Sequence, residues 1–501
     1  MSSTQGSVEE RLPPWAVSAA LTRHHGQLFS LLDRTILSNT LICCGAAVAE
    51  PLMGIADTAF VAKLGVVPLA SLGPNNTAFS FISFFAAFSL SVVVTDRIST
   101  CRAQGNPRGG ELSMSVAITI AVYLGLAFGL GMLLLPRQVL TLIGANEEIM
   151  ADAVAFMRVR ALSVPALLVS IAVEGAYRAF LDLRTPFVVI AAAAVLNVAL
   201  NAWLLFGLSF GVRGSALATT ASSWLAALSF AAALHLQGGQ RFSPEGGEAS
   251  EQKPRSHFLR DGVLFWRVCG SPVWRREAAV LCGRCAVLVM RASMIVAVYS
   301  VAGAVAARIG TAEVAGHQVL RQLLSLQVCL TWAYMSVGQS LVANLYESGA
   351  EGRATAGKVA ERVVLYGTLT ASVLCFGTWL ARDSLPSVVV DDASVLRAIK
   401  PAMLPACVML LASANNAFEG VLLGAGDVVF CTRSFFPAAA TAVAILFYSL
   451  WWHADLRAIW WALACYYCIL FALFFARATL PGMNGPLHIF WRRSAPESKF
   501  E

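Results

Sequence analysis

Asp57 is the residue of this 501-residue chain whose type and position most clearly suggest chemistry. It lies in a long apolar stretch, six residues after Pro51, where a charged carboxylate is costly to bury. Such surroundings favour the neutral form of a carboxyl group, so Asp57 can take up and release protons near physiological pH. We therefore predict that proton binding at Asp57 is coupled to bending near Pro51. The alternative is a carboxylate that caps a neighbouring helix or lies at the membrane interface.

Other acids also lie in or beside apolar stretches. Glu50 directly precedes the proline and, on a helix, would lie about 10 Å from Asp57 on a similar face. It is either a second proton carrier or the partner of an arginine. Glu174 with Arg178, and Glu419, lie near the ends of apolar stretches. We interpret these three residues as gate or structural ion-pair residues.

The second half of the chain has cations where the first half has Asp57. Its first apolar stretch contains Arg284 and Arg291, and the next contains His317 and Arg321. Inside hydrocarbon, such groups must face a cavity, a partner or the interface. Arg284 lies near a helix end, from which its side chain can extend to the membrane interface. Arg291, His317 and Arg321 are candidates for a substrate cavity, where they would favour organic anions.

Composition restricts the class of protein. Hydrophobic residues make up 57% of the chain and charged residues only 13%, which excludes a soluble enzyme. The net charge of +7 is spread between apolar runs, so we expect no nucleic-acid partner. Most of the 12 cysteines lie inside apolar stretches and are expected to be buried thiols. Cys282/Cys285 and Cys465/Cys468 have CxxC spacing, but each pair lies in an apolar run without companion ligands. Since no catalytic motif occurs either, we expect no enzyme, no metal and no cofactor.

Twelve apolar stretches are long enough to cross a membrane, at about 20 residues a crossing. The expected spans are 35–61, 68–94, 112–135, 153–175, 186–207, 213–236, 278–306, 313–343, 359–380, 397–423, 434–451 and 457–477. They predict an all-α integral membrane protein of about twelve transmembrane helices. A bend is expected in the second span, at Gly73-Pro74.

These spans define five regions. We expect an N-terminal segment (1–34), a six-helix bundle (35–236), a linker (237–277), a second six-helix bundle (278–477) and a tail (478–501). The distribution of Lys and Arg places both termini and the linker in the cytoplasm. Four tryptophans flank the last short loop and are expected to form an aromatic belt at the interface: Trp451, Trp452, Trp460 and Trp461.

An internal repeat relates the two halves. Three matches occur at one offset of 245 residues: Ala62-Lys63-Leu64-Gly65 with Ala307-Arg308-Ile309-Gly310, Glu174-Gly175 with Glu419-Gly420, and Asp182 with Asp427. A common offset indicates duplication of a six-helix unit. Because six crossings return the chain to its starting side, the halves must share one orientation, related by a pseudo-two-fold axis along the membrane normal. A central cavity between the halves is then expected.

Four segments carry a resemblance to a known family. They are Glu50–Gly65, with Lys63 where arginine is usual, Tyr177–Pro186, Asn197–Thr219 and Gly420–Asp427. In this order they resemble the multidrug and toxic-compound extrusion (MATE) family, in the branch related to DNA-damage-inducible protein F. The resemblance covers about residues 30 to 480. It implies a V-shaped pair of six-helix bundles.

The resemblance also implies an activity and a site. Members of the family are secondary active antiporters that export small organic compounds, such as drugs, toxins or metabolites, in exchange for H⁺ or Na⁺ by alternating access. The implied cation site comprises Asp57, Asn197, Asn201 and Thr219. Asn201 stands where the family has an aspartate, and loss of that carboxylate favours H⁺ over Na⁺. The alternative for both asparagines is hydrogen bonding between helices.

Other readings stay open at this point. A lipid-linked oligosaccharide flippase or an organic-anion exporter of the same superfamily would suit the arginines of the second half. A channel is not favoured, because the sequence contains no repeated filter-like loop. The expected partners are a small organic substrate and the lipid bilayer, and the resemblance implies a monomer. The sequence leaves open whether the membrane is the plasma membrane or that of an organelle, such as a plastid.

Overall fold

The computed structural model is almost entirely helical. It describes residues 25–64, 66–143, 145, 147–242, 271–346, 349–390, 393–451 and 455–480. No strand occurs within these ranges. Long apolar sequences form helices here because a helix satisfies every backbone N–H and C=O group within its own segment, which hydrocarbon surroundings require.

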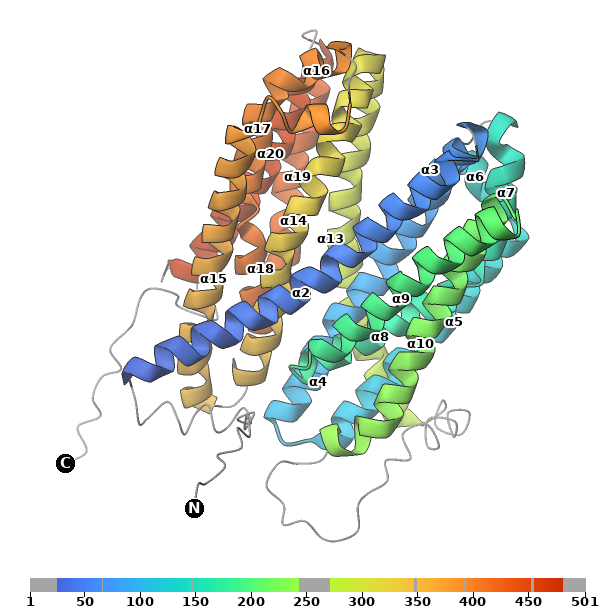
Figure 1. Ribbon diagram of the computed structural model, residues 1–501. Helices are drawn as coiled ribbons and strands as arrows, with labels where there is room; N and C mark the ends of the chain where they lie inside the picture. Colours follow the sequence, from blue (N-terminus) through green and yellow to red (C-terminus); the bar gives the residue numbers. More distant parts are fainter. Residues whose placement is uncertain are drawn as a thin grey trace, which may run out of the picture.

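The helices group into two bundles (Figure 1). The first bundle contains α2 (His25–Ala62), α3 (Val66–Ile82), the π-helix η1 (Ser83–Phe88), α4 (Ser89–Ala103), α5 (Pro107–Leu134), α6 (Pro136–Ile143), α7 (Glu147–Ala161), α8 (Val164–Ala179), α9 (Arg184–Ala202), the π-helix η2 (Trp203–Gly207) and α10 (Val212–Phe242). The second bundle contains α13 (Pro272–Ile309), α14 (Thr311–Tyr346), α15 (Gly349–Leu380), η3 (Pro386–Val388), α16 (Ala393–Ile399), η4 (Lys400–Ala402), α17 (Met403–Ala412), α18 (Asn415–Gly424), α19 (Val428–Trp451) and α20 (Leu456–Thr479).

Several of these helices are long and apolar enough to cross a membrane. In the described ranges nine meet that condition, or ten if the pair α7 and α8, bent by 49°, is one span. These ten spans together with α2 and α14 make twelve helical segments, six in each bundle. Large apolar side chains lie exposed on their outer faces, among them Leu134, Val195 and Phe376. Such faces are suited to contact with lipid chains.

The bundles meet along one end of the molecule and diverge toward the other. Figure 1 shows them furthest apart where α3, α6 and α7 of one bundle and α16 of the other lie. Packing between the bundles runs through α13 and α14, which contact α2, α4 and α5. We call the end at which α4 ends and α13 begins the joined end, and the opposite end the divergent end.

Several helices extend beyond the expected spans. Helix α2 begins at His25, within the expected N-terminal segment, and α10 and α13 extend into both ends of the expected linker. Residues 1–24, 243–270 and 481–501 lie outside the described residues. Pro74 lies inside α3, so the departure from α-helical geometry in this span is η1, about ten residues later.

The repeated Glu-Gly pair marks a close approach between helices in each bundle. A Cβ atom built on Gly175 of α8 would lie 2.6 Å from the backbone oxygen of Ser91 in α4. A Cβ atom on Gly420 of α18 would meet the backbone oxygen of Met335 in α14 more closely still. Only glycine permits such close approach, which explains why the duplicated halves share this residue.

Candidate functional site

Asp57, Asn197, Asn201 and Thr219 lie together in the first bundle and are joined by hydrogen bonds. Asn201 Nδ2 donates to Asp57 Oδ1 at 2.7 Å, and Thr219 Oγ1 donates to Asp57 Oδ2 at 3.3 Å. Asn197 Nδ2 donates to Thr219 Oγ1 at 3.2 Å, and Asn201 Nδ2 also contacts Asn197 Oδ1 at 3.2 Å. We call these four residues the Asp57 cluster.

Three helices bring the cluster together. Asp57 comes from α2, the two asparagines from α9 and Thr219 from α10. The asparagines are four residues apart, so they project from one face of α9, and both side chains are buried. The cluster lies near the divergent end, since α2 ends five residues after Asp57 and α10 begins seven residues before Thr219.

Apolar side chains and a cation lie beside the Asp57 cluster. The cluster adjoins a small hydrophobic core that includes Val61, Leu204 and Ala216. Arg160 of α7 lies close enough to Asp57 to interact with its carboxylate electrostatically. Its guanidinium lies over the ring of Phe79, at 4.5 Å from the centroid. An opposite charge at this range stabilises the ionised form of Asp57.

Arg160 was not among the site residues predicted from the sequence, although its position inside an apolar span could have indicated a role. The expected fourth span, 153–175, contains an arginine well inside its limits, and such residues are rarely without a partner. The structure places Arg160 in the last turn of α7, where the span bends before α8. That bend brings α7 against α3 and α10 and so directs the arginine toward the Asp57 cluster.

The second bundle has no equivalent of the Asp57 cluster at its repeat-related positions. The offset of 245 residues relates the four residues of the Asp57 cluster, in chain order, to Ala302, Ala442, Leu446 and Ala464. All four of these side chains are fully buried. The polar group of the first bundle is therefore replaced by close apolar packing in the second.

Glu174 and Arg178 form a pair within the first bundle. The pair joins successive turns of α8 at 3.8 Å, and Arg178 also donates to Ser91 Oγ of α4. It therefore holds α8 against α4 beside the close approach at Gly175. Glu50 and Pro51 lie within α2, and their side chains lie outside the described residues.

Glu419, the repeat counterpart of Glu174, pairs with Arg291 rather than with a residue of its own helix. Arg291 Nε of α13 lies 2.6 Å from Glu419 Oε1 of α18, and both side chains are buried. The guanidinium also lies over two rings, 5.2 Å from Phe88 of the first bundle and 4.8 Å from Phe435 of α19. The charge of Arg291 is thus compensated by a carboxylate.

His317 and Arg321 lie one turn apart on α14 in different surroundings. His317 is buried against Trp460, with ring centroids 5.7 Å apart, whereas Arg321 is exposed. Trp460 is therefore a core residue, which corrects its assignment to an aromatic belt; Trp451 is exposed, and Trp452 lies outside the described residues. Arg284 pairs with Asp96 of α4.

Comparison with known proteins places the chain in a family. The MatE family model matches residues 43–203 and again residues 288–448. The second match begins and ends 245 residues after the first, which is the offset of the internal repeat. The two matches together cover more than half of the chain.

Individual relatives agree with this result. Over 422 residues the chain is 28% identical to Protein DETOXIFICATION 44, chloroplastic, of Arabidopsis thaliana, covering 80% of this chain and 73% of that protein. It is 30% identical to DNA damage-inducible protein F of Escherichia coli over 213 residues, covering 41% and 43% of the two chains. The outward-facing structure of a multidrug resistance MATE family transporter has the same fold, with a TM-score of 0.71 at 16% identity over 89% of this chain and 94% of that one. The chain belongs to the MatE family of multidrug and toxic-compound extrusion proteins and is a membrane transporter of small organic compounds.

Proposed function

We propose that this protein is an antiporter that exports small organic compounds in exchange for H⁺ by alternating access, and that Asp57 carries the proton. The observation that supports this proposal most directly is the pairing of the Asp57 carboxylate with two side-chain donors, Asn201 and Thr219, in an otherwise apolar part of the first bundle. An ionisable residue in such a position is expected to be functional.

Protonation would change the hydrogen bonding of three helices at once. The ionised carboxylate accepts from α9 through Asn201 and from α10 through Thr219. A proton on Oδ2 turns that oxygen into a donor, so the Thr219 hydroxyl must turn away or accept instead. Protonation also removes the attraction between Asp57 and Arg160. Proton binding therefore alters how α2 packs against α7, α9 and α10.

Two features favour H⁺ over Na⁺. Asn201 presents its Nδ2 donor to Asp57, whereas a sodium site requires converging oxygen atoms. Arg160 adds a positive charge close to the carboxylate, which opposes a bound metal cation but leaves protonation possible.

The charge of the second bundle bears on the substrate. Glu419 compensates Arg291, so this arginine provides no net positive charge to attract organic anions. We therefore propose that neutral or cationic compounds are transported in preference to anions. Transport of cationic and anionic dyes can be compared in proteoliposomes. Faster transport of the anionic dyes would contradict this preference.

The coupling residue can be tested by transport in proteoliposomes. We expect that Asp57→Asn reduces uptake driven by a pH gradient at least tenfold, because the amide cannot exchange a proton. Asp182→Asn is the matched control: Asp182 accepts from the first backbone N–H groups of α9 and lies outside the Asp57 cluster, so H⁺-driven flux should persist. Flux that persists in Asp57→Asn, or that requires Na⁺ in the wild-type protein, would disprove the assignment.

We also propose that the protein works in a plastid membrane. The support is the similarity to DETOXIFICATION 44, whose name describes it as chloroplastic. A fluorescent fusion of the full chain in plant cells should overlap with chlorophyll emission. Labelling of the plasma membrane instead would contradict this location.

A further inference from the structure

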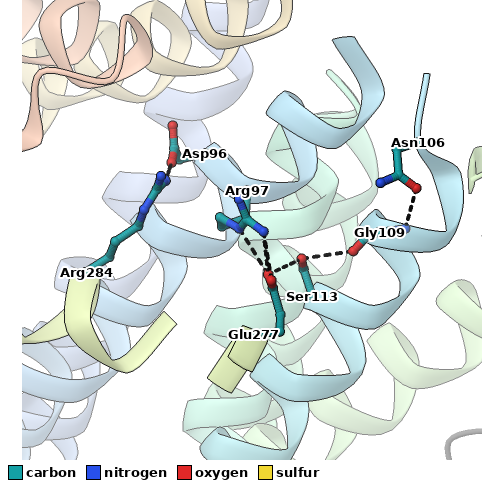
Figure 2. A network of polar contacts seen from close by, with 7 residues as sticks. All are labelled: Asp96, Arg97, Asn106, Gly109, Ser113, Glu277 and Arg284. Atoms are coloured by element: carbon teal, nitrogen blue, oxygen red, sulfur yellow. Dashed lines mark hydrogen bonds and ion pairs between the residues drawn. The ribbon is translucent and has the colours of Figure 1, made fainter. Parts of the chain in front are cut away.

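Two ion pairs connect the bundles at the joined end. Arg97 of α4 binds Glu277 of α13 with both carboxylate oxygens engaged: Nη2 lies 2.9 Å from Oε1 and 2.8 Å from Oε2, and Nε lies 3.0 Å from Oε1. The neighbouring Asp96 pairs with Arg284, two turns further along α13. Figure 2 shows both pairs bridging the same two helices.

A serine of the first bundle adds a further contact to this pair across the boundary. Ser113 Oγ of α5 donates to Glu277 Oε1 at 2.7 Å (Figure 2). The Arg97 and Glu277 side chains are only 22% and 12% exposed. A two-point arginine–carboxylate contact that is largely shielded from water is stronger and more directional than an exposed ion pair.

Amide side chains continue the connection along the same boundary. Gln339 Nε2 of α14 donates to the backbone oxygen of Val92 at 3.2 Å. Asn344 Nδ2 donates to the backbone oxygen of Ala179 at 3.0 Å and contacts Ser99 Oγ at 3.3 Å. Ser99 and Asn344 are themselves 245 residues apart, so they are equivalent in the repeat. Contact between equivalent residues places the pseudo-two-fold axis at this boundary.

The charged residues of α4 at this boundary have no charged counterparts in the second half of the chain. The positions equivalent to Asp96 and Arg97 in the second half are Leu341 and Val342, which are buried in α14. Four charged side chains therefore lie where the bundles meet. The equivalent helix α14 has apolar residues at the positions of Asp96 and Arg97, so a helix in this position does not require charged residues there. Apolar packing alone would be difficult to separate and rejoin in each transport cycle, whereas polar groups can be solvated when the boundary opens.

We propose that the pairs Arg97–Glu277 and Asp96–Arg284 form a latch that holds the joined end closed and must break each time the transporter opens to that side. These four are positioning residues: they lie at the opposite end of the molecule from the Asp57 cluster, and they set the balance between the two access states. Weakening the latch shifts this balance toward the state that is open at the joined end.

The chain contains its own reporter for this opening. Cys101 of α4 lies one turn beyond Arg97, is 5% exposed, and is within electrostatic reach of Arg97, Glu277 and Asp96. Separation of α13 from α4 would uncover its thiol. Cys431, fully buried within α19 of the second bundle, reports general unfolding instead. Both can be followed in the full-length protein with its natural cysteines.

The test measures the rate at which a hydrophilic maleimide modifies Cys101 and Cys431 in nanodiscs, with peptide mass spectrometry as the readout. We expect Arg97→Ala and Glu277→Gln each to raise the Cys101 rate about tenfold without changing Cys431, which corresponds to a shift of about 1.4 kcal/mol. The exchanged pair, Arg97→Glu with Glu277→Arg, should return the rate to within about twofold of wild type. Arg137→Ala is the control, since it removes an exposed pair with Glu147 inside the first bundle.

Several results would overturn the proposal. An unchanged Cys101 rate in both single variants would do so, as would an exchanged pair that reacts as fast as the single variants. If the single variants also expose Cys431, Arg284→Gln decides, because it breaks the second pair without removing a charge that acts on Cys101. Faster labelling of Cys101 alone supports the latch, and an unchanged rate contradicts it. Because labelling needs neither an ion gradient nor a substrate, this result is independent of the role proposed for Asp57.

Discussion

At the scale of single residues, the main question is what an asparagine does in a place where an acid would give a second charge. Asn201 donates a hydrogen bond to Asp57 at 2.7 Å, so it stabilises the ionised carboxylate without adding charge. The identity of this residue could be read from the sequence, but the direction of its hydrogen bond could not. Arg160 was missed for a similar reason, because its approach to Asp57 depends on the bend between α7 and α8.

This geometry predicts that one substitution changes the ion. In Asn201→Asp, two carboxylates would replace a donor–acceptor pair, and repulsion between them favours either a shared proton or a bound cation. We expect Na⁺ to stabilise this variant against heat, by about 2.7 kcal/mol when its concentration is a hundred times the Kd, while K⁺ has no such effect. Asn201→Leu, which copies the repeat-related Leu446, is the matched control. An equal response to K⁺, or a response of the wild type to Na⁺, would count against this account.

At the scale of helices, the sequence predicted much of the architecture and little of its irregularity. The two-bundle fold and the equivalence of the halves follow from apolar runs and from matches such as Glu174-Gly175 with Glu419-Gly420. The π-helix η1 and the partner of Glu419 could not be predicted. Pairing between α13 and α18 depends on the rotation of each helix about its axis, which only tertiary packing determines.

The close approach at Gly420 makes a prediction about helix packing. In Gly420→Ala the added methyl group would overlap the backbone of Met335, and backbone cannot move aside as a flexible side chain can. We expect a loss of about 1–3 kcal/mol of stability, measured as a lower midpoint of thermal unfolding for the detergent-solubilised protein. Gly283→Ala is the control, because a Cβ there meets nothing within 4 Å, and its stability should be unchanged or slightly higher. Equal effects at the two glycines would refute the packing argument.

At the scale of the whole molecule, duplication has produced two bundles with similar backbones and different polar contents. The first bundle contains the Asp57 cluster, and the second has apolar residues at the equivalent positions. Arg291 and Glu419 form the second bundle's own buried pair, in contact with Phe88 of the first bundle. We infer that the first bundle responds to the proton, while the second serves as the partner against which it moves.

This division predicts that a carboxylate cannot be moved from one bundle to the other. Ala302→Asp would place an acid at the counterpart of Asp57, but Ala442, Leu446 and Ala464 offer it no side-chain donor. In the Asp57→Asn background we expect H⁺-driven transport to stay at the level of Asp57→Asn alone, measured in proteoliposomes with monodisperse protein. In the wild-type background Ala302→Asp should lower stability yet leave transport coupled to H⁺. Recovery of transport in the double variant would show that either bundle can carry the proton, and that the donors around Asp57 are not what makes it the coupling site.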